Sequence, residues 1–327
     1  MAQPRIITLT LNPTLDAETE ASSIQPTHKI HTSAERVEAG GGGINVARMV
    51  RVLGGDALAL ILAGGSTGRD LEAELDRLAL PWQSVEIAHR TRMCLTVLDR
   101  SSGLEYRFVP QGPVVSDSEW RAALELIGSA GGDWLVASGS LPEGLPEDAY
   151  AQVAQLAARR GLRFVLDSSG AALAAALRAG RSAVATQADL PLIELIKPSL
   201  RELEELAARP LPAVADQVEA ARHLVRSGAV RTVAVTLGEA GALLVDATSA
   251  IALAAPPEPV HSAVGAGDAF LAGFVLSLAR GDLPRHALAW GIAAGGAVVA
   301  ASADRHVERA AIETRYRHLL ELTPTLL

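Results

Sequence analysis

Residues Ala57-Leu58-Ala59-Leu60-Ile61-Leu62-Ala63 are apolar at every position. Such a run is typical of a strand that is buried on both faces of a sheet. The helical pattern of Gly68–Leu78 follows it after a short glycine-containing connection. A strand followed by a helix of this kind is the unit from which parallel sheets are built.

The same unit recurs along the chain. Further strands are predicted at Ile6–Leu11, Trp134–Ser138, Arg163–Asp167, Ile193–Ile196 and Arg231–Thr236. Further helices are predicted at Ile44–Leu53, Asp117–Ile127, Asp148–Arg160, Leu200–Ala208 and Val214–Ser227. This alternation predicts an α/β fold, a mostly parallel central sheet with helices on both faces.

Two hairpins interrupt the alternation. Arg92–Asp99 and Leu104–Val109 flank Ser101-Ser102-Gly103, and with Ser33–Glu38 they are expected to form a small separate sheet. A second hairpin is predicted at Gly241–Leu253. From Gly265 onward the pattern is helical, and Arg181–Leu192 is predicted to be a surface loop.

Composition excludes several classes of protein. The 327 residues are 49% hydrophobic and 20% charged, which is typical of a globular chain and not of a disordered one. The formal net charge of -8, without a Lys/Arg run, argues against a nucleic-acid partner. A single cysteine, Cys94, and the lack of a signal peptide or a long apolar run favour a cytoplasmic protein with no membrane segment.

The strongest candidate for chemistry is Val264-Gly265-Ala266-Gly267-Asp268-Ala269-Phe270, a glycine loop that runs into an apolar helix. Such a loop and helix N-terminus aim several backbone N–H groups at one point and favour an anion. A carboxylate at Asp268 would repel that anion unless it accepts a proton from a hydroxyl that attacks a phosphorus. The alternative is a turn followed by an ordinary N-capped helix.

Three other glycine or acidic motifs suggest ligand contacts. Gly40–Arg48 opens a helix with four glycines and carries Asn45, but it matches neither a dinucleotide fingerprint nor a Walker A loop. Asn12-Pro13-Thr14-Leu15-Asp16 follows the first strand, where a carboxylate suits the hydroxyls of a sugar. Thr236–Gly241 leads a strand into a glycine turn that could cradle phosphates, or could be a plain hairpin turn.

Arg92 and Arg107 occupy corresponding places in the two arms of the first hairpin. Paired guanidinium groups bind phosphate directionally, although exposed arginines on a strand are also common. The eight histidines show no metal-ligand spacing, and Cys94 and Ser168-Ser169 have no evident base partner. Nucleophilic catalysis is therefore not favoured.

In order along the chain, these motifs resemble the PfkB (ribokinase-like) family of carbohydrate kinases. The residues that carry the resemblance are Thr8–Pro13 with Asp16, Gly40–Arg48, Tyr106–Phe108, Ser138–Pro142, Asp167–Gly170 and Val264–Asp268. Gly40–Arg48 together with Ser138–Pro142 is similar to the hexose-phosphate branch of the family.

The resemblance implies a ribokinase-like fold over residues 1–327, with a β-sheet lid formed by about 12–40 and 90–110. It also implies ATP as donor, Mg²⁺, and a homodimer joined through the lid. Asp268 matches the catalytic base, and Gly265, Ala266 and Gly267 match the anion hole. The positions matching substrate contacts are Asp16, Lys29, Gly41, Gly42, Asn45, Arg92, Arg107 and Ser140. Those matching the nucleotide side are Lys197, Ser199, Thr236, Gly238 and Gly241, with Glu202 ordering magnesium through water.

The chain departs from the family pattern in three places. Ser199 stands where an asparagine is usual ahead of Glu202, so weaker handling of the metal is expected. Ala301 and Ala303 stand where near relatives have Asn and Gly beside a monovalent-cation site, so potassium activation is not expected. Arg181–Leu192 is similar to an insertion near the nucleotide side.

The predicted function is the transfer of the ATP γ-phosphoryl group to a hydroxyl of fructose 6-phosphate. Fructose 1-phosphate and tagatose 6-phosphate are the alternative acceptors. A sugar-phosphate sensor without transfer activity is an alternative from another class, because Ser199 departs from the pattern. A dinucleotide-dependent oxidoreductase is a third, although the chain lacks the G-x-G-x-x-G and acid arrangement.

Overall fold

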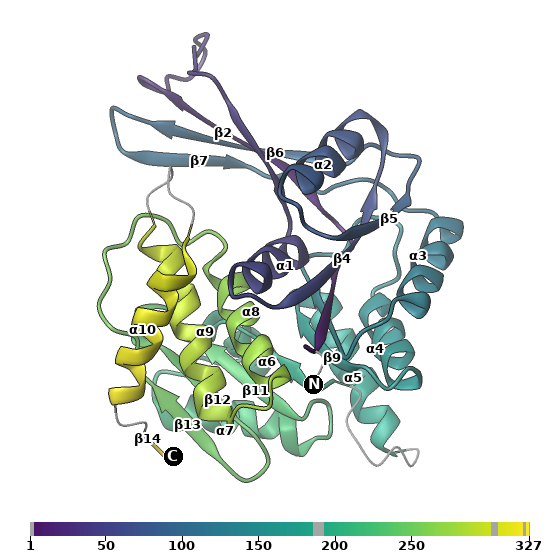
Figure 1. Ribbon diagram of the computed structural model, residues 1–327, viewed down its shortest axis with the longest axis vertical. Coiled ribbons are helices and arrows are strands. Elements are labelled where there is room, and N and C mark those ends of the chain that lie inside the picture. The colour runs from purple at the N-terminus through teal and green to yellow at the C-terminus, as the bar shows by residue number, and fades with distance from the viewer. Residues whose placement is uncertain (1–2, 186–192, 302–306, 323–324, 327) are drawn as a thin grey trace.

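The computed structural model describes residues 3–185, 193–301, 307–322 and 325–326, and for residues 182–185 and 326 it describes the backbone only. The described chain forms a ten-stranded sheet and a separate four-stranded sheet (Figure 1). The large sheet contains β1 (Arg5–Thr10), β4 (Asp56–Ala63), β5 (Trp82–Glu86), β8 (Trp134–Ser138), β9 (Arg163–Asp167), β10 (Leu195–Ile196), β11 (Thr232–Thr236), β12 (Ala242–Val245), β13 (Ala250–Leu253) and β14 (Thr325–Leu326). The predicted fold class is thereby confirmed.

The strand order of the large sheet is β14-β13-β12-β11-β10-β9-β8-β1-β4-β5. The strands from β5 to β11 pair in parallel, and β12, β13 and β14 add antiparallel pairs. After β1 the chain moves first to one side through β4 and β5, and then to the other through β8. Such a reversal leaves a crevice at the carboxyl ends of the strands beside it, where ligands bind in open α/β sheets.

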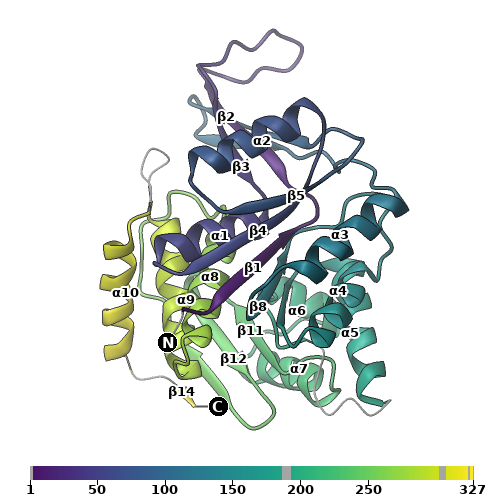
Figure 2. The same ribbon diagram turned by 45° about the vertical axis from the view of Figure 1, so that its right-hand side comes forward.

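Helices cover both faces of the large sheet (Figure 2). The helices are α1 (Gly42–Val52), α2 (Gly65–Arg77), α3 (Asp117–Ser129), α4 (Ala149–Arg159), α5 (Gly170–Ala185), α6 (Leu200–Ala207), α7 (Val214–Arg226), α8 (Ala266–Ala279), α9 (Pro284–Val299) and α10 (Arg309–Glu321). Neighbouring residues of β1 point to opposite faces, so Ile6 joins a core with α1, α8 and α9, whereas Ile7 joins a core with α3, α4 and α7. Strands that are apolar at every position contribute side chains to both cores.

Helix α8 lies inside the first of these cores. All its residues from Ala269 to Ser277 are buried, so it presents no polar face to water. Glycine makes the packing possible, because a Cβ at Gly273 would lie 2.6 Å from the carbonyl oxygen of Trp290 in α9. Helix α10 is fixed on α9 by the stacked rings of Trp290 and Tyr316, whose centroids are 4.1 Å apart.

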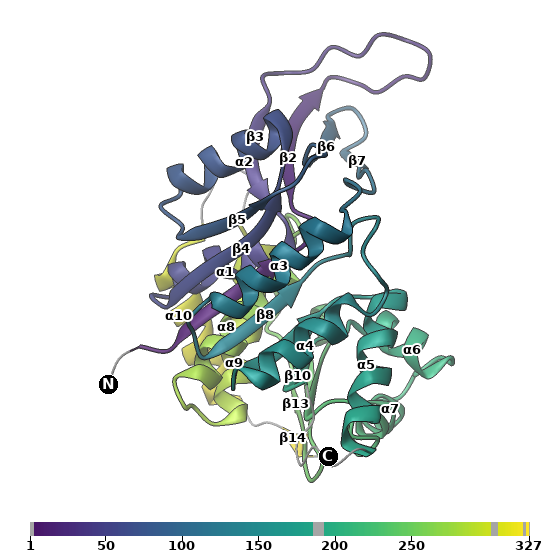
Figure 3. The ribbon, with the colours of Figure 1, turned by 90° about the vertical axis from the view of Figure 1, so that its right-hand side faces the viewer.

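The four-stranded sheet has the order β3-β2-β6-β7 and consists of β2 (Thr14–Ala21), β3 (Arg36–Gly40), β6 (Arg92–Asp99) and β7 (Leu104–Phe108). It stands above the rest of the molecule, and the long connection between β2 and β3 extends beyond it (Figure 3). The predicted hairpin of β6 and β7 is confirmed. The register Asp16↔Cys94 and Thr96↔Arg107 gives β2, β6 and β7 a common polar face.

Some elements differ from the sequence prediction. Helix α5 continues through Ala185, so the predicted loop at Arg181–Leu192 is wrong for its first residues, and residues 186–192 lie outside the described part of the chain. Strands β2 and β5 and helix α5 were not predicted. The chain after Gly265 is helical in α8, α9 and α10 but ends in the two-residue strand β14. In the described part of the chain, every helix is too short or too polar to cross a membrane.

Candidate active site

The carboxyl ends of the parallel strands bring polar residues to one edge of the large sheet. Ser138 and Asp167 are the last residues of β8 and β9, Lys197 directly follows β10, and Thr236 ends β11. These residues are far apart in the sequence, yet the parallel register places them side by side. The edge lies where the strand order predicts a ligand crevice.

The loop before α8 reaches this edge of the large sheet, and the helix begins there. Gly265 is the N-cap of α8 and has φ 75°, a left-handed conformation that glycine adopts without strain. Ala266, Gly267 and Asp268 then form the first helical turn, in which Ala266 N donates to Ala263 O at 3.3 Å and the N–H groups of Gly267 and Asp268 have no partner within the helix. The predicted anion-binding loop therefore has the backbone geometry that such a site requires.

Asp268 is held by two side chains from other elements. Its Oδ2 accepts a hydrogen bond from Asn45 Nδ2 in α1 at 2.9 Å, and its Oδ1 accepts one from Ser138 Oγ at 3.4 Å. Burial raises the pKa of Asp268 from 3.8 to about 7, and the Asp167 carboxylate adds to the increase. A carboxylate with this pKa is a far better proton acceptor near neutral pH than an exposed aspartate.

A second carboxylate, Asp167, forms an ion pair behind the base. Its Oδ1 lies 3.2 Å from Lys197 Nζ, and its Oδ2 lies 3.3 Å from Ser138 Oγ, so the single proton of Ser138 is shared between Asp167 and Asp268. Burial disfavours the charged form of Lys197, but the Asp167 carboxylate outweighs it and raises the pKa of Lys197. A Cβ at Gly267 would lie 3.3 Å from Lys197 Nζ, so the ammonium group sits directly beside the anion-binding loop.

The glycines before α1 let that helix approach the site closely. A Cβ at Gly42 would lie 2.2 Å from Ser138 Oγ, and one at Gly40 would lie 2.0 Å from Asp16 Oδ2. Gly41 has φ 116° and packs against Thr10 at the end of β1. Larger residues at these positions would push α1, and Asn45 with it, away from Asp268.

The predicted sugar-phosphate residues gather on the polar face of the small sheet and around Asn12. Burial raises the pKa of Asp16, and the positive charges of Arg107 and Arg92 oppose the increase, so both guanidinium groups lie near that carboxylate. Ser140 Oγ accepts a hydrogen bond from Asn12 Nδ2 at 3.2 Å. Lys29 is different, because it lies exposed on the β2–β3 connection and no contact in the described part of the chain joins it to this group.

The predicted nucleotide-side residues also come together. Ser199 and Thr236 form an isolated bridge, and Thr236 N donates to Pro198 O at 3.0 Å. Gly238 and Gly241 begin and end the following turn with φ 62° and 102°. A Cβ at Gly241 would lie 2.1 Å from the carbonyl oxygen of Leu253, so the turn packs tightly on the end of β13.

Ser199 has a structural role that the comparison with the family pattern did not reveal. It caps α6, and Glu202 Oε2 accepts hydrogen bonds from Ser199 N at 2.7 Å and from Ser199 Oγ at 2.9 Å. This is a capping box, which fixes the Glu202 carboxylate. Its negative charge also contributes to the raised pKa of Lys197.

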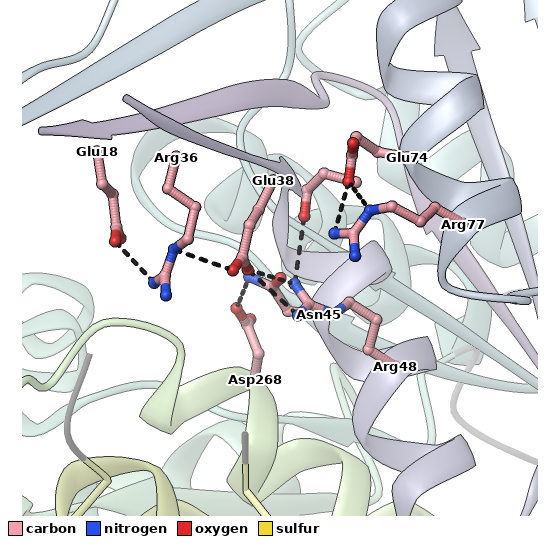
Figure 4. A network of polar contacts seen from close by, with 9 residues as sticks. Glu18, Arg36, Glu38, Asn45, Arg48, Glu74, Arg77 and Asp268 are labelled. Carbon is pink, nitrogen blue, oxygen red and sulfur yellow. Dashed lines mark hydrogen bonds and ion pairs between the residues drawn. The ribbon is translucent and has the colours of Figure 1, made fainter. Parts of the chain in front are cut away.

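Ion pairs connect the small sheet to α1 beside the base (Figure 4). Arg36 of β3 lies 3.0 Å from Glu18 on the neighbouring strand β2 and 3.4 Å from Glu38 on its own strand. Arg48 of α1 lies 3.3 Å from Glu38, one helical turn after Asn45. The helix that positions Asp268 is thus tied to the sheet that carries Asp16.

The described residues contain no group of three or more His, Cys, Asp or Glu side chains that could hold a metal ion. The described residues therefore suit Mg²⁺ only if the ion is bound largely by substrate phosphates and water, which is common for nucleotide-dependent enzymes. Glu202 fits that requirement, because its carboxylate is fixed near Lys197 at the nucleotide side.

Ser138 and Asp167 are site residues to which the sequence analysis assigned no role. Both stand at the last position of a strand that was predicted with the bounds the structure has. Their position at the carboxyl end of a buried parallel strand was the available signal. Their contacts with Asp268 and Lys197 depend on how distant segments pack, which that signal does not contain.

Comparison with known proteins gives consistent matches over most of the chain. Residues 10–310 match the model of the pfkB family of carbohydrate kinases. ATP-dependent 6-phosphofructokinase isozyme 2 of Escherichia coli (strain K12) is 40% identical over 294 residues, 90% of this chain and 92% of that protein. 1-Phosphofructokinase of Rhodobacter capsulatus is 31% identical over 302 residues, 90% of this chain and 91% of that protein.

A solved structure is similar over almost the whole chain. The crystal structure of phosphofructokinase-2 from Escherichia coli in complex with fructose-6-phosphate matches with a TM-score of 0.88 and 38% sequence identity. The match covers 97% of this chain and 100% of that one. The resemblance and the ribokinase-like fold predicted from the sequence are therefore confirmed.

Proposed function

The chain belongs to the pfkB family of carbohydrate kinases, and from this premise we propose that it transfers the γ-phosphoryl group of ATP to a hydroxyl of fructose 6-phosphate. The observation that carries the proposal is the position of Asp268. A carboxylate with a pKa of about 7 stands in the first turn of a helix whose N–H groups favour an anion. This combination suits a base that works beside a phosphoryl group.

In the proposed reaction Asp268 accepts the proton of the attacking hydroxyl. The oxygen of that hydroxyl forms the new bond to the γ-phosphorus, the bond from phosphorus to the β–γ bridging oxygen breaks, and ADP leaves. Asn45 and Ser138 hold the carboxylate in place by donating to its two oxygens. General-base catalysis of this kind contributes about 10²–10⁴-fold to the rate.

The N–H groups of Gly265, Ala266 and Gly267 stabilise the charge that develops on the transferred group. Lys197 adds a positive charge beside the same loop, and its ion pair with Asp167 keeps the ammonium in place. Because these groups are positioned before the substrate binds, little reorganisation is needed during the reaction.

Ser199, Thr236, Gly238 and Gly241 form the proposed contact surface for the nucleotide. Glu202 would hold Mg²⁺ through water, and the ion would neutralise charge on the ATP phosphates. We do not expect potassium to activate the enzyme, since Ala301, two residues after the end of α9, offers no side-chain oxygen. Ala303, the other position on which this expectation rests, lies outside the described residues.

The small sheet is proposed to act as a lid formed by residues of about 12–40 and 90–110. Within this part of the site, Asp16 would bind sugar hydroxyls. The distal phosphate would be bound by Arg92, Arg107, Ser140 and Lys29. Leu104, Tyr106 and Phe108 alternate along β7, share one face and are 59%, 38% and 58% exposed. Three exposed apolar side chains on one strand favour burial against a second copy of the sheet. We therefore propose a homodimer joined through the lid, acting in the cytoplasm.

Two alternatives keep specific support. The similarity to a 1-phosphofructokinase supports fructose 1-phosphate as the acceptor, with tagatose 6-phosphate as a further possibility. The departure of Ser199 from the family pattern supports a sugar-phosphate sensor without transfer activity. Membership of a carbohydrate kinase family rules out the dinucleotide-dependent oxidoreductase considered from the sequence.

The test is a coupled assay of ADP release with MgATP and a panel of fructose 6-phosphate, fructose 1-phosphate, tagatose 6-phosphate and the free hexoses. We expect the highest kcat/KM for fructose 6-phosphate. A higher value for another hexose phosphate would keep the mechanism and change the acceptor. Binding of a hexose phosphate by calorimetry with no ADP release would contradict the kinase and favour the sensor.

A further inference from the structure

Asn12 has an unusual set of contacts that neither the family pattern nor the proposed mechanism explains. It follows β1, is 3% exposed and lies where four segments of the chain meet. Its Nδ2 donates to the carbonyl oxygen of Gln111 at 2.9 Å and to Ser140 Oγ at 3.2 Å. The main-chain carbonyl oxygen of Asn12 accepts a hydrogen bond from Arg92 Nη2 at 2.9 Å. One residue thus contacts two of the four residues proposed to bind the distal phosphate.

The contact with Gln111 fixes the orientation of the Asn12 amide. A backbone carbonyl oxygen can only accept a hydrogen bond, so the atom that faces it must be the NH₂ group. The same NH₂ group then donates to Ser140 Oγ. Gly112 is required for this arrangement, because a Cβ there would lie 2.2 Å from Asn12 Oδ1.

This orientation has a chemical consequence for Ser140. A hydroxyl that accepts from the Asn12 amide keeps its own proton free to donate elsewhere. Ser140 is therefore prepared as a donor, which is the role that a phosphate oxygen needs from it. An acceptor at the position of Asn12 Nδ2 would instead attract that proton.

Arg92 is prepared in a similar way. Two of its N–H groups are bound by the carbonyl oxygens of Asn12 and of Pro110, at 2.9 and 3.0 Å. Carbonyl oxygens orient a guanidinium group without neutralising its charge. These two bonds use two of the five N–H donors of the guanidinium, so the group retains its charge and further donors.

We propose that Asn12 is a positioning residue that orients Ser140 and Arg92 toward the distal phosphate, and that it thereby sets the preference for phosphorylated over unphosphorylated sugars. This inference rests on the proposed function. It assigns Asn12 no contact with the reacting hydroxyl or with ATP. Its effect should therefore be confined to the phosphate-bearing end of the acceptor.

The principal variant is Asn12→Asp, which is nearly isosteric but places an acceptor and a negative charge where the amide donates. We expect kcat/KM for fructose 6-phosphate to fall about 10- to 100-fold, as for the loss of hydrogen bonds to a charged group. The KM for ATP and the kcat/KM for free fructose should stay within about twofold, so the preference for the phosphorylated sugar falls by the same factor.

Thr8→Val is the matched control. Thr8 is fully buried on β1, the strand that precedes Asn12, and its Oγ1 has no hydrogen-bond partner in the described part of the chain, so its replacement should leave every kinetic constant unchanged. Asn12→Ala, Ser140→Ala and the double variant form a second test. If Asn12 acts through Ser140, the double variant should bind fructose 6-phosphate less weakly than the two single losses multiplied together.

Calorimetric titration of fructose 6-phosphate separates this inference from the proposed function, because it needs no turnover. Wild-type binding that is weakened in Asn12→Asp supports the inference even if no ADP is released. Equal losses for fructose 6-phosphate, free fructose and ATP would overturn it and make Asn12 a general structural residue. Unchanged binding in Asn12→Asp or in Asn12→Ala would also overturn it.

Discussion

The two ends of the site rest on different kinds of structure. Asp268 stands on α8, whose residues from Ala269 to Ser277 are all buried, and its carboxylate is held by side chains from α1 and β8. Arg107 stands on β7, where every residue from Leu104 to Phe108 is exposed. The end proposed for chemistry is therefore rigid before any ligand arrives, whereas the end proposed for recognition depends on an exposed strand. We therefore expect substitutions at the first end to lower turnover and substitutions at the second end to weaken acceptor binding.

The largest expected effect is that of Asp268→Asn. We expect kcat to fall about 10²–10⁴-fold, since the amide cannot accept the proton, while the KM values change little. The melting temperature should not decrease, because burial already disfavours the charged carboxylate. Asp117→Asn, in the first turn of α3, is the control and should keep full turnover. Near-normal kcat in Asp268→Asn would show that another group accepts the proton.

Lys197→Met tests the rigidity of the same end through folding stability. It leaves Asp167 buried without its positive partner, so we expect unfolding by urea to show a loss of about 3–5 kcal/mol at pH 8. The loss should shrink at lower pH, because burial raises the pKa of Asp167 and a proton can replace the missing charge. Arg201→Met, which breaks an exposed pair on α6, should cost less than about 1 kcal/mol. Equal losses of unfolding free energy in the two variants would show that the buried ion pair does not stabilise this end of the site more than an exposed pair stabilises α6.

The pH dependence should report the environment of Asp268 directly. Because the base must be ionised, kcat/KM should rise about tenfold per pH unit below pH 7 and level off above it. Folding stability should change in the opposite direction. The folded state binds a proton that the unfolded state has released, so this contribution is full below pH 3.8 and is lost as the pH rises through 7. Asp268→Asn should remove that part of the stability profile, and a stability profile equal to that of the wild type would argue against the raised pKa.

The smallest expected effect comes from the exposed end. Arg107→Ala should raise the KM for the sugar phosphate about tenfold, as for the loss of one charge-assisted hydrogen bond, and leave the KM for ATP unchanged. Stability should stay within about 0.5 kcal/mol, since the strand is exposed. Arg100→Ala in the same hairpin, where Arg100 pairs with Glu20, is the control. Similar increases in both KM values would show that the small sheet is not confined to recognition.

The sequence predicted best the elements that consist mainly of buried apolar residues. Trp134–Ser138 and Arg163–Asp167 were predicted with the bounds that the structure has, because apolar runs of this length fit few alternatives. Strand β2 was not predicted because Asn12–Asp16 was considered only as the segment that follows the first strand, although Asp16, Glu18 and Glu20 alternate with buried residues as in a half-buried strand. Its pairing with β6 is a long-range contact, which local patterns do not reveal.

The site was predictable as a set of motifs but not as an arrangement. Asp268 and its glycine loop were identified from local sequence, because a loop and a helix N-terminus are local structures. The capping box of Ser199 and Glu202 carried a readable signal, the Ser-x-x-Glu spacing, that the family comparison obscured. The contacts of Ser138 with Asp268 and of Asn12 with Gln111 join segments more than 90 residues apart, and only the folded chain brings them together.

The close packing of α8 on α9 also limits how this enzyme can diverge. Gly273 and Gly291 admit no side chain without displacing Trp290 or Phe270. Substitutions at these positions therefore disturb the packing of the core. Substitutions on the face of β7 that carries Glu105 and Arg107 carry no such penalty. A lineage that starts from this chain can therefore explore new acceptor sugars through the small sheet while it inherits the phosphoryl-transfer chemistry almost unchanged.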